Sequence, residues 1–267
     1  MRLARSMPPD RPGSALAKPL GKAKLPTAAS DTQSTAAFGE GFILKVFAVF
    51  AAMAVLSALI SIGGKYAGRS IALGGHTEDQ TLREIVIGNN VLVVPANAIR
   101  FENERRHGVA AGLHLYLKWP EMKGYRADLR DDFNHAGGAR NILFLSFEPR
   151  MMSRDMSGRL EPIYRSLIRS PGKAGSAGLT NYEFIEKSGY MNEMLVVGPD
   201  ETGAGTFVAR CLTGAVAEQS LADCERDVFV GDDLALVYRF PSSLLAAWRR
   251  IDAAVLAYSK ATIKTGT

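Results

Sequence analysis

One uninterrupted apolar run dominates the hydropathy pattern of the chain. From Val46 to Ile62 there are 17 residues without a charged side chain, and Ser57 and Ser61 are the most polar among them. As a helix this run would be about 25 Å long, and the flanking residues of 41–64 extend it to the roughly 30 Å of a bilayer core. A buried helix of a soluble domain usually has a polar face, which this run lacks. The pattern therefore predicts one transmembrane helix at 41–64.

After residue 82 the pattern changes to short segments with the period-2 alternation of β-strands. Leu113 to Trp119 alternates between apolar and polar positions, which is typical of a half-exposed strand, whereas Ile142 to Phe147 is apolar almost throughout, as in the centre of a sheet. Asn89-Asn90 lies between two β-branched runs and predicts a hairpin. The expected strands are 84–88, 91–95, 113–119, 142–147, 182–186, 193–197, 206–211, 227–230 and 234–240.

Helical patterns are fewer. The strongest lies at 244–258, where apolar residues recur at helical spacing and Ser242 or Ser243 can cap the first turn. Shorter helices are expected at 125–134 and 160–169. We expect the last helix to pack on one face of a largely antiparallel sheet, so that the fold class is α+β.

The charge distribution separates the N-terminal part from the rest. Residues 1–64 contain seven Lys and Arg against three Asp and Glu, so most of the net charge of +5 lies there. The remainder is nearly neutral, which argues against nucleic acid as a partner. Residues 1–40 are rich in Ala, Pro, Ser and Lys without a helical or strand period, and are predicted to be a disordered tail.

The same charges predict the orientation in a membrane. Basic residues on the N-terminal side favour a cytoplasmic tail, a signal-anchor helix at 41–64, a polar stalk at 65–81 and a periplasmic domain at 82–267. A cleaved signal peptide is the competing interpretation. The apolar run is longer than the core of such a peptide, and no A-x-A cleavage site follows it.

Cys211 and Cys224 are the only two cysteines, and both follow the apolar run. An even pair in a domain outside the cytoplasm is typical of a disulfide. The alternative is two reduced thiols in a cytosolic domain. A metal site is disfavoured because no histidine lies near the two sulfurs in the sequence.

No complete catalytic or cofactor motif is present. Residues 174–178 approach the nucleophile elbow of hydrolases but have the wrong spacing, and Lys173 lacks the rest of a phosphate-binding loop. Asp131, Asp132 and His135 form a possible ligand cluster, but the pattern is more typical of the solvated face of a short helix. We therefore predict no catalytic residue, cofactor or metal.

The stretch from Glu148 to Arg169 interleaves arginines with Met and Tyr side chains. Guanidinium groups near such side chains suit a protein or anionic envelope partner. Asp155 and Glu161 in the same stretch equally allow a solvated surface with internally paired charges. The candidate binding residues are Arg150, Arg154, Arg159, Arg165 and Arg169.

Small residues follow one side of the apolar helix. They are Ala54, Ser57, Ala58 and Ser61. Because small side chains let two helices approach closely, this side could mediate helix pairing.

Four segments carry a resemblance to a known group of proteins. They are IVIGNNVLVVPANAIRFENERR (85–106), FLSFEPRMMSRDMSGRLEPIYRSLI (144–168), EKSGYMNE (186–193) and VYRFP (237–241). The chain after residue 80 resembles single-pass envelope proteins of alphaproteobacteria, a group to which no activity is assigned. The resemblance implies a bacterial inner-membrane location and transfers no catalytic residue.

Three functions agree with these patterns. The first is a periplasmic interaction domain with a structural or assembly role in the cell envelope. The second is a membrane-tethered periplasmic hydrolase, which would require His114 or His135 beside a carboxylate in a pocket. The third is a sensor or binding module for an anionic envelope ligand at 148–169.

Overall fold

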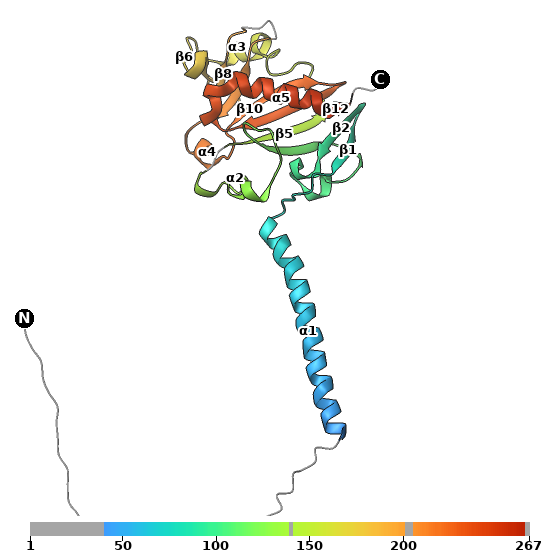
Figure 1. Cartoon of the computed structure of the whole chain (residues 1–267). Coiled ribbons are helices and arrows are strands. Elements are labelled where there is room, and N and C mark those ends of the chain that lie inside the picture. Colours follow the sequence, from blue (N-terminus) through green and yellow to red (C-terminus); the bar gives the residue numbers. More distant parts are fainter. Residues whose placement is uncertain (1–39, 139–140, 201–204, 265–267) are drawn as a thin grey trace, which may run out of the picture. The chain divides into compact units, whose positions relative to one another are not determined.

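The computed structural model describes residues 40–138, 141–200 and 205–264 (Figure 1). The tail predicted to be disordered, residues 1–40, lies outside these ranges except for its last residue. The chain divides into two units at Leu59 and Ile60. The helix that contains this division and the folded domain are described separately.

Helix α1, Glu40–Leu73, is the first described element and has 34 residues. Its segment Gly41–Gly63 is the one stretch of the described chain that is long and apolar enough to cross a membrane, and all its side chains are exposed. These 23 residues reach about 35 Å as a helix, which spans a bilayer core. The helix continues to Leu73, so the first part of the expected stalk is helical, and a turn follows at Gly74 and Gly75.

His76 packs against the folded domain directly after this turn. Its Nδ1 lies 3.0 Å from the hydroxyl of Tyr116, its Nε2 lies 3.2 Å from Oδ1 of Asn134, and its ring stacks on Tyr125. Burial lowers the pKa of His76 below its ordinary value. The segment expected to form a polar stalk is therefore packed on the domain from His76 onward.

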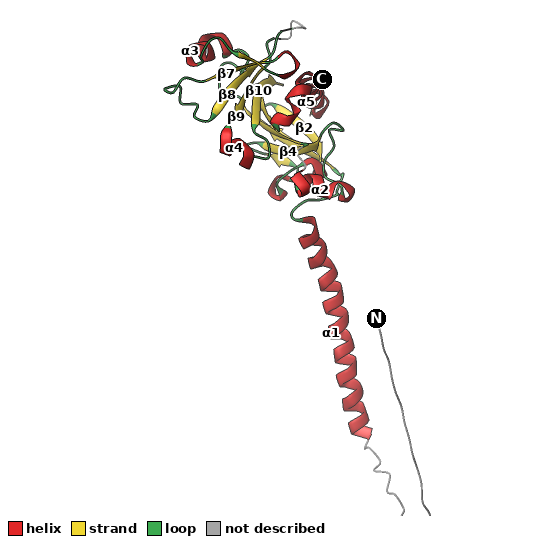
Figure 2. Ribbon diagram, turned by 90° about the vertical axis from the view of Figure 1, so that its left-hand side faces the viewer, coloured by secondary structure: helices red, strands yellow, loops and turns green. Residues whose placement is uncertain are grey.

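The described part of the domain contains two sheets (Figure 2). The larger has the order β4-β5-β11-β10-β9-β8-β7-β6, and the smaller has the order β12-β2-β1-β3. All pairs are antiparallel except β1 with β3. The strands are β1 Leu82–Ile87, β2 Asn90–Pro95, β3 Gly108–Val109, β4 Leu113–Lys118, β5 Ile142–Pro149, β6 Lys173–Ala174, β7 Thr180–Glu183, β8 Glu193–Val197, β9 Val208–Leu212, β10 Cys224–Val230, β11 Leu234–Phe240 and β12 Ile263–Lys264. The α+β class is confirmed. Each of the nine expected strands overlaps an observed one: 193–197 and 234–240 match their bounds, and the other seven have shifted ends.

Helix α5, Trp248–Thr262, closes the main core (Figure 1). Its buried residues Trp248, Ile251 and Val255 join apolar side chains from both sheets in one cluster. The predicted helix is therefore confirmed, but its predicted cap is wrong. A 3₁₀ helix, Ser242–Ala247, comes first, and neither serine accepts a capping hydrogen bond because the chain enters this turn from Pro241.

Short helices make up the rest of the described secondary structure. The expected helix at 125–134 is reduced to a 3₁₀ turn and α2, and the expected helix at 160–169 begins with a π-turn. The segment between the two cysteines contains α4. The bounds are η1 Ala96–Ala98, η2 Glu102–Glu104, η3 Ala127–Leu129, α2 Arg130–Phe133, η4 Ala136–Gly138, the π-helix η5 Leu160–Tyr164, α3 Arg165–Leu167, η6 Ser176–Gly178 and α4 Gly214–Gln219.

The face of the larger sheet opposite α5 is covered at its two ends and open between them. At the β4 end, Phe133 of α2 packs on Tyr116 in one cluster. At the β8 and β9 end, Leu160 and Tyr164 of η5 pack on Leu195 in another. These two layers leave the outward side chains of β5, β11 and β10 without a covering helix.

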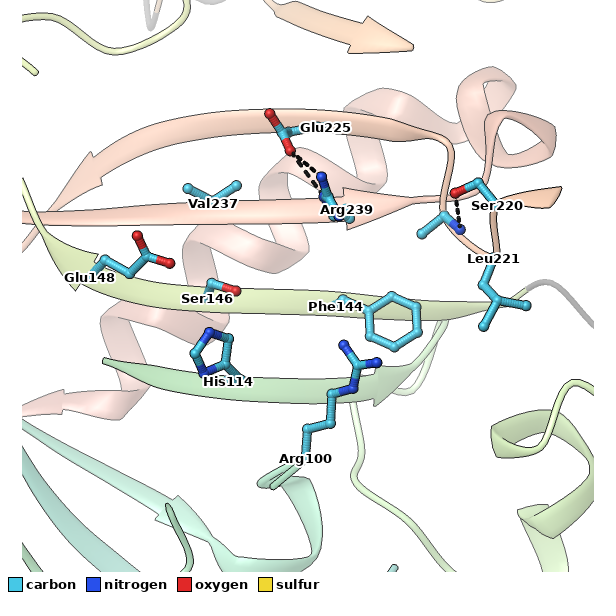
Figure 3. Close-up of a pocket in the computed structure, with 11 residues that line it drawn as sticks. Arg100, His114, Phe144, Ser146, Glu148, Ser220, Leu221, Glu225, Val237 and Arg239 are labelled. Carbon is cyan, nitrogen blue, oxygen red and sulfur yellow. Dashed lines mark hydrogen bonds and ion pairs between the residues drawn. The ribbon is translucent and has the colours of Figure 1, made fainter. Parts of the chain in front are cut away.

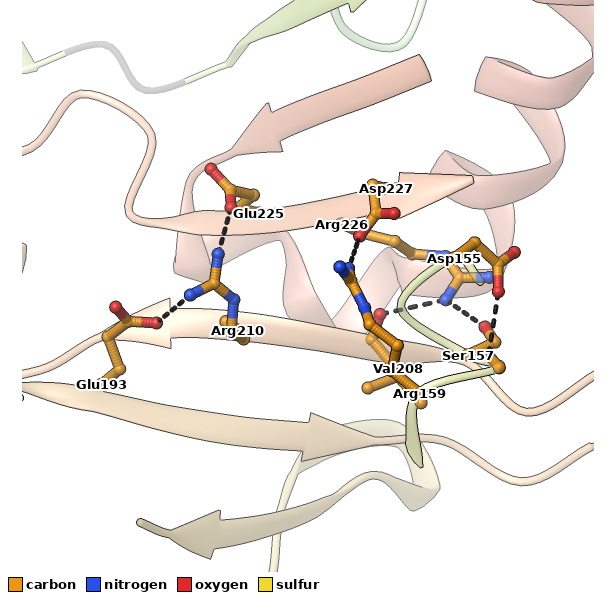
Figure 4. Close-up of polar contacts among 10 residues, drawn as sticks. Asp155, Ser157, Arg159, Glu193, Val208, Arg210, Glu225, Arg226 and Asp227 are labelled. Atoms are coloured by element: carbon orange, nitrogen blue, oxygen red, sulfur yellow. Dashed lines mark hydrogen bonds and ion pairs between the residues drawn. The ribbon is translucent and has the colours of Figure 1, made fainter. Parts of the chain in front are cut away.

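Strands β9 and β10 separate after two paired positions. They pair at Cys211–Cys224 and Arg210–Glu225, whereas β10 stays paired with β11 along its full length. Where the strands diverge, Arg226 donates to the carbonyl of Val208 at 3.0 Å and to Ser157 at 2.8 Å (Figure 4). The side chain of Arg226 thus supplies a hydrogen bond to β9 at a point where no backbone pairing with β10 is present.

Candidate functional site

A cavity of about 480 Å³ lies on the open part of the larger sheet (Figure 3). Its floor follows from the strand register. His114 on β4 is opposite Ser146 on β5, and Ser146 is opposite Val237 on β11. In the neighbouring row Phe144 of β5 is opposite Arg239 of β11. Since side chains alternate along each strand, these residues share the outward face.

Two smaller cavities adjoin the first. One, of about 100 Å³, shares Glu225 and Arg239 with it, and the other, of about 220 Å³, shares Glu148 and Val237. We refer to the three together as the outer groove. Exposed Met151 and Met152 line the second of the smaller cavities. The groove is therefore an elongated depression with polar walls and a partly apolar floor.

The wall formed by β8, β9 and β10 is an ion-pair chain. Arg210 donates to Glu193 at 3.1 Å and to Glu225 at 2.5 Å (Figure 4), and Glu225 also accepts from Arg239 at 2.9 Å (Figure 3). Burial raises the pKa of Glu193 although Arg210 opposes the shift. Burial acts to lower the pKa of Arg210, but the two glutamates outweigh it and raise that pKa. The positive charges of Arg210 and Arg239 are therefore compensated by the negative charges of Glu193 and Glu225.

Two exposed charged side chains in the groove have no partner of opposite sign among the described residues. Arg100 is exposed, and its guanidinium lies over the rings of Phe144, at 4.9 Å, and Phe101, at 5.1 Å. Glu148 is exposed on β5. No ion pair or side-chain hydrogen bond joins Arg100 or Glu148 to another residue of the described chain. An incoming ligand would not have to break an ion pair to reach either group.

His114 is the histidine that the cavity brings beside a carboxylate. Its Nδ1 lies 2.7 Å from Oε1 of Glu104, and its backbone N–H donates to the same carboxylate at 2.9 Å. Ser146 is its cross-strand neighbour, but no hydrogen bond between the two side chains occurs among the described residues. The adjacent backbone of β5 is paired with β4 and β11. The N–H groups of β5 next to Ser146 are thus used in the sheet and do not form an oxyanion hole.

The arginines predicted from the sequence are spread over the surface beside the groove. Arg150 pairs with Asp233, Arg159 with the buried Asp227, Arg165 with Glu161 at 3.0 Å, and Arg169 lies 3.7 Å from Glu186. No such pair to Arg154 is present in the described part of the chain. Of the five, Arg159 lines the groove.

This pairing agrees with the interpretation of a solvated surface with internally paired charges. Burial raises the pKa of Asp227 although Arg159 opposes the shift, so this pair lies inside the domain and contributes to its structure.

The predicted disulfide is present. The sulfurs of Cys211 and Cys224 are bonded, and the two residues are opposite each other on β9 and β10. The possible ligand cluster of the sequence is not assembled. Asp132 binds Lys118 at 2.7 Å, and α2 ends at Phe133 before it reaches His135. Within the described residues no three metal-binding side chains gather at one point.

Sequence reasoning missed Arg100, Phe144 and Val237 because they lie on three segments far apart in the chain. The strand order places β11 between β5 and β10, and no local pattern encodes this order. The dipeptide Arg100-Phe101 was a usable signal, since an arginine beside an aromatic ring is common at binding surfaces.

Comparisons with known proteins give a distant structural likeness. No protein-family model matches the sequence, and no curated protein matches it. The immunity protein Smlt3025 of the Stenotrophomonas maltophilia type IV secretion system aligns with a TM-score of 0.47 and 15% identity over 73% of this chain and 98% of its own. The iron-regulated outer membrane lipoprotein FrpD of Neisseria meningitidis aligns with a TM-score of 0.42 and 8% identity over 69% and 95%. Likenesses of this size transfer no function.

Proposed function

We propose that the chain is a single-pass protein of the bacterial inner membrane whose periplasmic domain binds a partner protein. The segment 41–64 would be the signal anchor, with the N-terminal tail in the cytoplasm. The domain would have a structural or assembly role in the cell envelope. The resemblance to alphaproteobacterial envelope proteins supports the same location.

The observation that carries the proposal is the combination of α1 with the disulfide. A segment of 23 residues that is apolar except for Lys45, Ser57 and Ser61, with every side chain exposed, is unfavourable in water. The Cys211–Cys224 bond persists in an oxidising compartment and is rare in the bacterial cytoplasm. Together they favour a membrane anchor with the domain outside the cytoplasm.

Reporter fusions test this orientation. Alkaline phosphatase, which is active only when exported, is fused after Thr267, and green fluorescent protein is fused there in a matched strain. We expect phosphatase activity without fluorescence, and Cys211 and Cys224 that resist alkylation until a reductant is added. Fluorescence together with freely alkylated thiols would contradict the proposal.

The outer groove supports a binding role for the domain. It is elongated, its floor mixes apolar and polar side chains, and two of its exposed charges have no ion-pair partner in the described part of the chain. A photo-crosslinking residue at Val237 should therefore form a discrete adduct in cells, whereas the same residue at exposed Glu121, outside the groove, should not. Adducts of equal yield at both positions would argue against the groove as the binding surface.

A hydrolase is the second candidate, because His114 lines the 480 Å³ cavity and lies beside the carboxylate of Glu104. In this function His114 would activate Ser146 or a water molecule as a general base. Ester hydrolysis or covalent labelling by a fluorophosphonate that disappears in Ser146→Ala and His114→Gln would favour it. Labelling that persists in both variants would exclude these two residues.

Two further partner hypotheses stay proposals. The arginines at 148–169 could bind an anionic envelope ligand, in which case Ala at Arg150, Arg154 and Arg165 would abolish that binding. The small residues of α1, Ala54, Ser57, Ala58 and Ser61, could pair two copies of the helix in the membrane.

A further inference from the structure

We propose that the outer groove recognises an extended peptide segment that carries an acidic and a basic side chain about four residues apart. This inference rests on the proposed function and specifies the chemistry of the partner. The acidic side chain would bind Arg100 and the basic one Glu148. Apolar side chains between them would lie on the floor of the groove.

Arg100 is suited to a carboxylate. Its guanidinium is planar, lies over the rings of Phe101 and Phe144, and has all its N–H groups without a carboxylate partner in the described chain. Aromatic rings below a guanidinium restrict its motion and leave the N–H edge available for a bidentate contact. A charge-assisted pair of this kind is stronger than a neutral hydrogen bond.

Glu148 provides the opposite charge at a defined separation. It lies on the same face of β5 as Phe144, over which Arg100 lies, and is four residues further along the strand (Figure 3). Four residues of a strand correspond to about 13 Å. A bound extended peptide has the same rise per residue, so an acid and a base four residues apart match the two unpaired charges.

The surface between the two charges is suited to short apolar side chains. Ser146 and Val237 occupy the centre of the floor, with Ala235 opposite Glu148. The backbone of β5 is paired on both sides, so the peptide would lie across side chains and would not add a strand to the sheet.

The opposite charges of Arg100 and Glu148 favour a peptide as the ligand of the groove. Anionic glycans and anionic lipid headgroups supply only negative charge, which would satisfy Arg100 and oppose Glu148. A protein segment supplies both signs at a fixed spacing. The chain's own N-terminal tail lies on the other side of the membrane in the proposed orientation, so the segment comes from another protein.

Fluorescence anisotropy with synthetic peptides tests the inference on the full-length protein in detergent micelles. The probe is a fluorescein-labelled, C-terminally amidated peptide, Gly-Gly-Glu-Ala-Leu-Ala-Lys-Gly. One comparison peptide places Glu and Lys next to each other, and another replaces Lys by Gln. We expect the probe to bind more tightly than both, because only the probe reaches both charges in an extended conformation.

Matched variants assign the two contacts. Arg100→Gln and Glu148→Gln should each weaken binding of the probe about threefold to tenfold, as expected for loss of a partly exposed charged contact. Glu148→Gln should leave binding of the Lys-to-Gln peptide unchanged, because that peptide lacks the partner of Glu148. Arg106→Gln and Glu121→Gln change exposed residues outside the groove and should have no effect.

Three results would overturn the inference. They are no binding of the probe at millimolar concentration, equal binding of the peptide with adjacent charges, and probe binding that is unchanged in both groove variants. If any of these occurs while the Val237 crosslink still forms in cells, the groove binds a partner of other chemistry and only this inference fails. If the reporter fusions place the domain in the cytoplasm, the proposed function fails independently of the peptide result.

Discussion

Arg226 is a buried cation whose guanidinium joins three parts of the domain. Its side chain is 7% exposed and forms an ion pair with Asp252 of α5 at 3.1 Å. Asp252 also accepts a hydrogen bond from the hydroxyl of Tyr238 at 2.6 Å. The guanidinium thus connects α5, β10 and the segment at Ser157, and all its charge is compensated locally.

Removal of this guanidinium should destabilise the domain strongly. In Arg226→Met the carboxylate of Asp252 loses its cationic partner and keeps the hydroxyl of Tyr238, the carbonyl of Val208 loses the guanidinium donor, and breaking a buried pair costs about 3–5 kcal/mol. The double variant Arg226→Met/Asp252→Asn should lose less than the sum of the single variants, because no unpaired charge remains.

Urea unfolding of the full-length protein in detergent, followed by tryptophan fluorescence, measures both values. Both tryptophans, Trp119 and Trp248, lie in the domain, so the signal does not report on α1. Lys260→Met changes an exposed residue of the same helix and is the control. A loss in Arg226→Met no greater than in the control would contradict the structural role of Arg226.

His76 should make the stability of the domain depend on pH. Because burial lowers its pKa, the folded state disfavours the protonated ring, and stability is lost as the pH falls from the ordinary value of 6.5 through the lowered pKa. In His76→Gln this loss is absent. The difference in free energy of unfolding between pH 8 and pH 5 should therefore be smaller in the variant, as measured by urea unfolding at both pH values. A variant with an unchanged or larger pH dependence would contradict the assignment.

At the scale of elements, the disulfide holds β9 and β10 together at the point before they diverge. The two strands share two paired positions, and one of them is the Cys211–Cys224 pair. Beyond it the strands are connected through Arg226 and its contacts to Val208 and Ser157. The disulfide therefore joins β9 and β10 covalently at the end where the two strands are still paired.

Replacement of both cysteines by serine should lower the free energy of unfolding by about 3 kcal/mol, since the bond closes a loop with a sequence separation of 13. Urea unfolding of the native protein with dithiothreitol should give the same value as the double variant without it. Equal stability of the native and double-variant proteins without reductant would show that the bond does not form.

The sequence predicts strands well where they are long enough to show an apolar pattern, alternating or continuous, and poorly where they are too short to show one. Leu113 to Lys118 and Leu234 to Phe240 alternate because they cover a common core, so their period is visible in the residues alone. Strands β3, β6 and β12 have two residues each, which is too short for a period. The predicted serine cap failed because a 3₁₀ turn, which the apolar spacing does not distinguish from an α-helix, precedes α5.

The candidate site was less visible than the fold. The sequence identified a charged stretch from Glu148 to Arg169, and the structure pairs most of its arginines with carboxylates. Arg100 and Glu148 form a site only because β4, β5 and β11 are neighbours, and β11 is separated from β5 by about 85 residues of sequence. Long-range strand order therefore decides the site.

At the scale of the whole molecule, the membrane-spanning candidate and the domain have separate physical requirements. The apolar part of α1 is long and apolar enough to cross a membrane and its side chains are exposed, whereas the domain buries its own apolar residues in a core formed by two sheets and α5. The domain also retains exposed methionines, Met151 and Met152, beside the outer groove. Met side chains adapt to irregular surfaces, which agrees with a role in binding.

The smaller sheet joins the beginning of the domain to its end. β12 pairs with β2 at Ile263–Leu92, and Lys264 contacts Glu84 of β1 at 2.7 Å. During synthesis, which proceeds from the N-terminus, this edge of β2 therefore stays unpaired until Ile263 and Lys264, about 170 residues further along the chain, have been made. A nascent chain that stalls before Ile263 would leave this edge open to proteases, so synthesis of β12 protects the first hairpin.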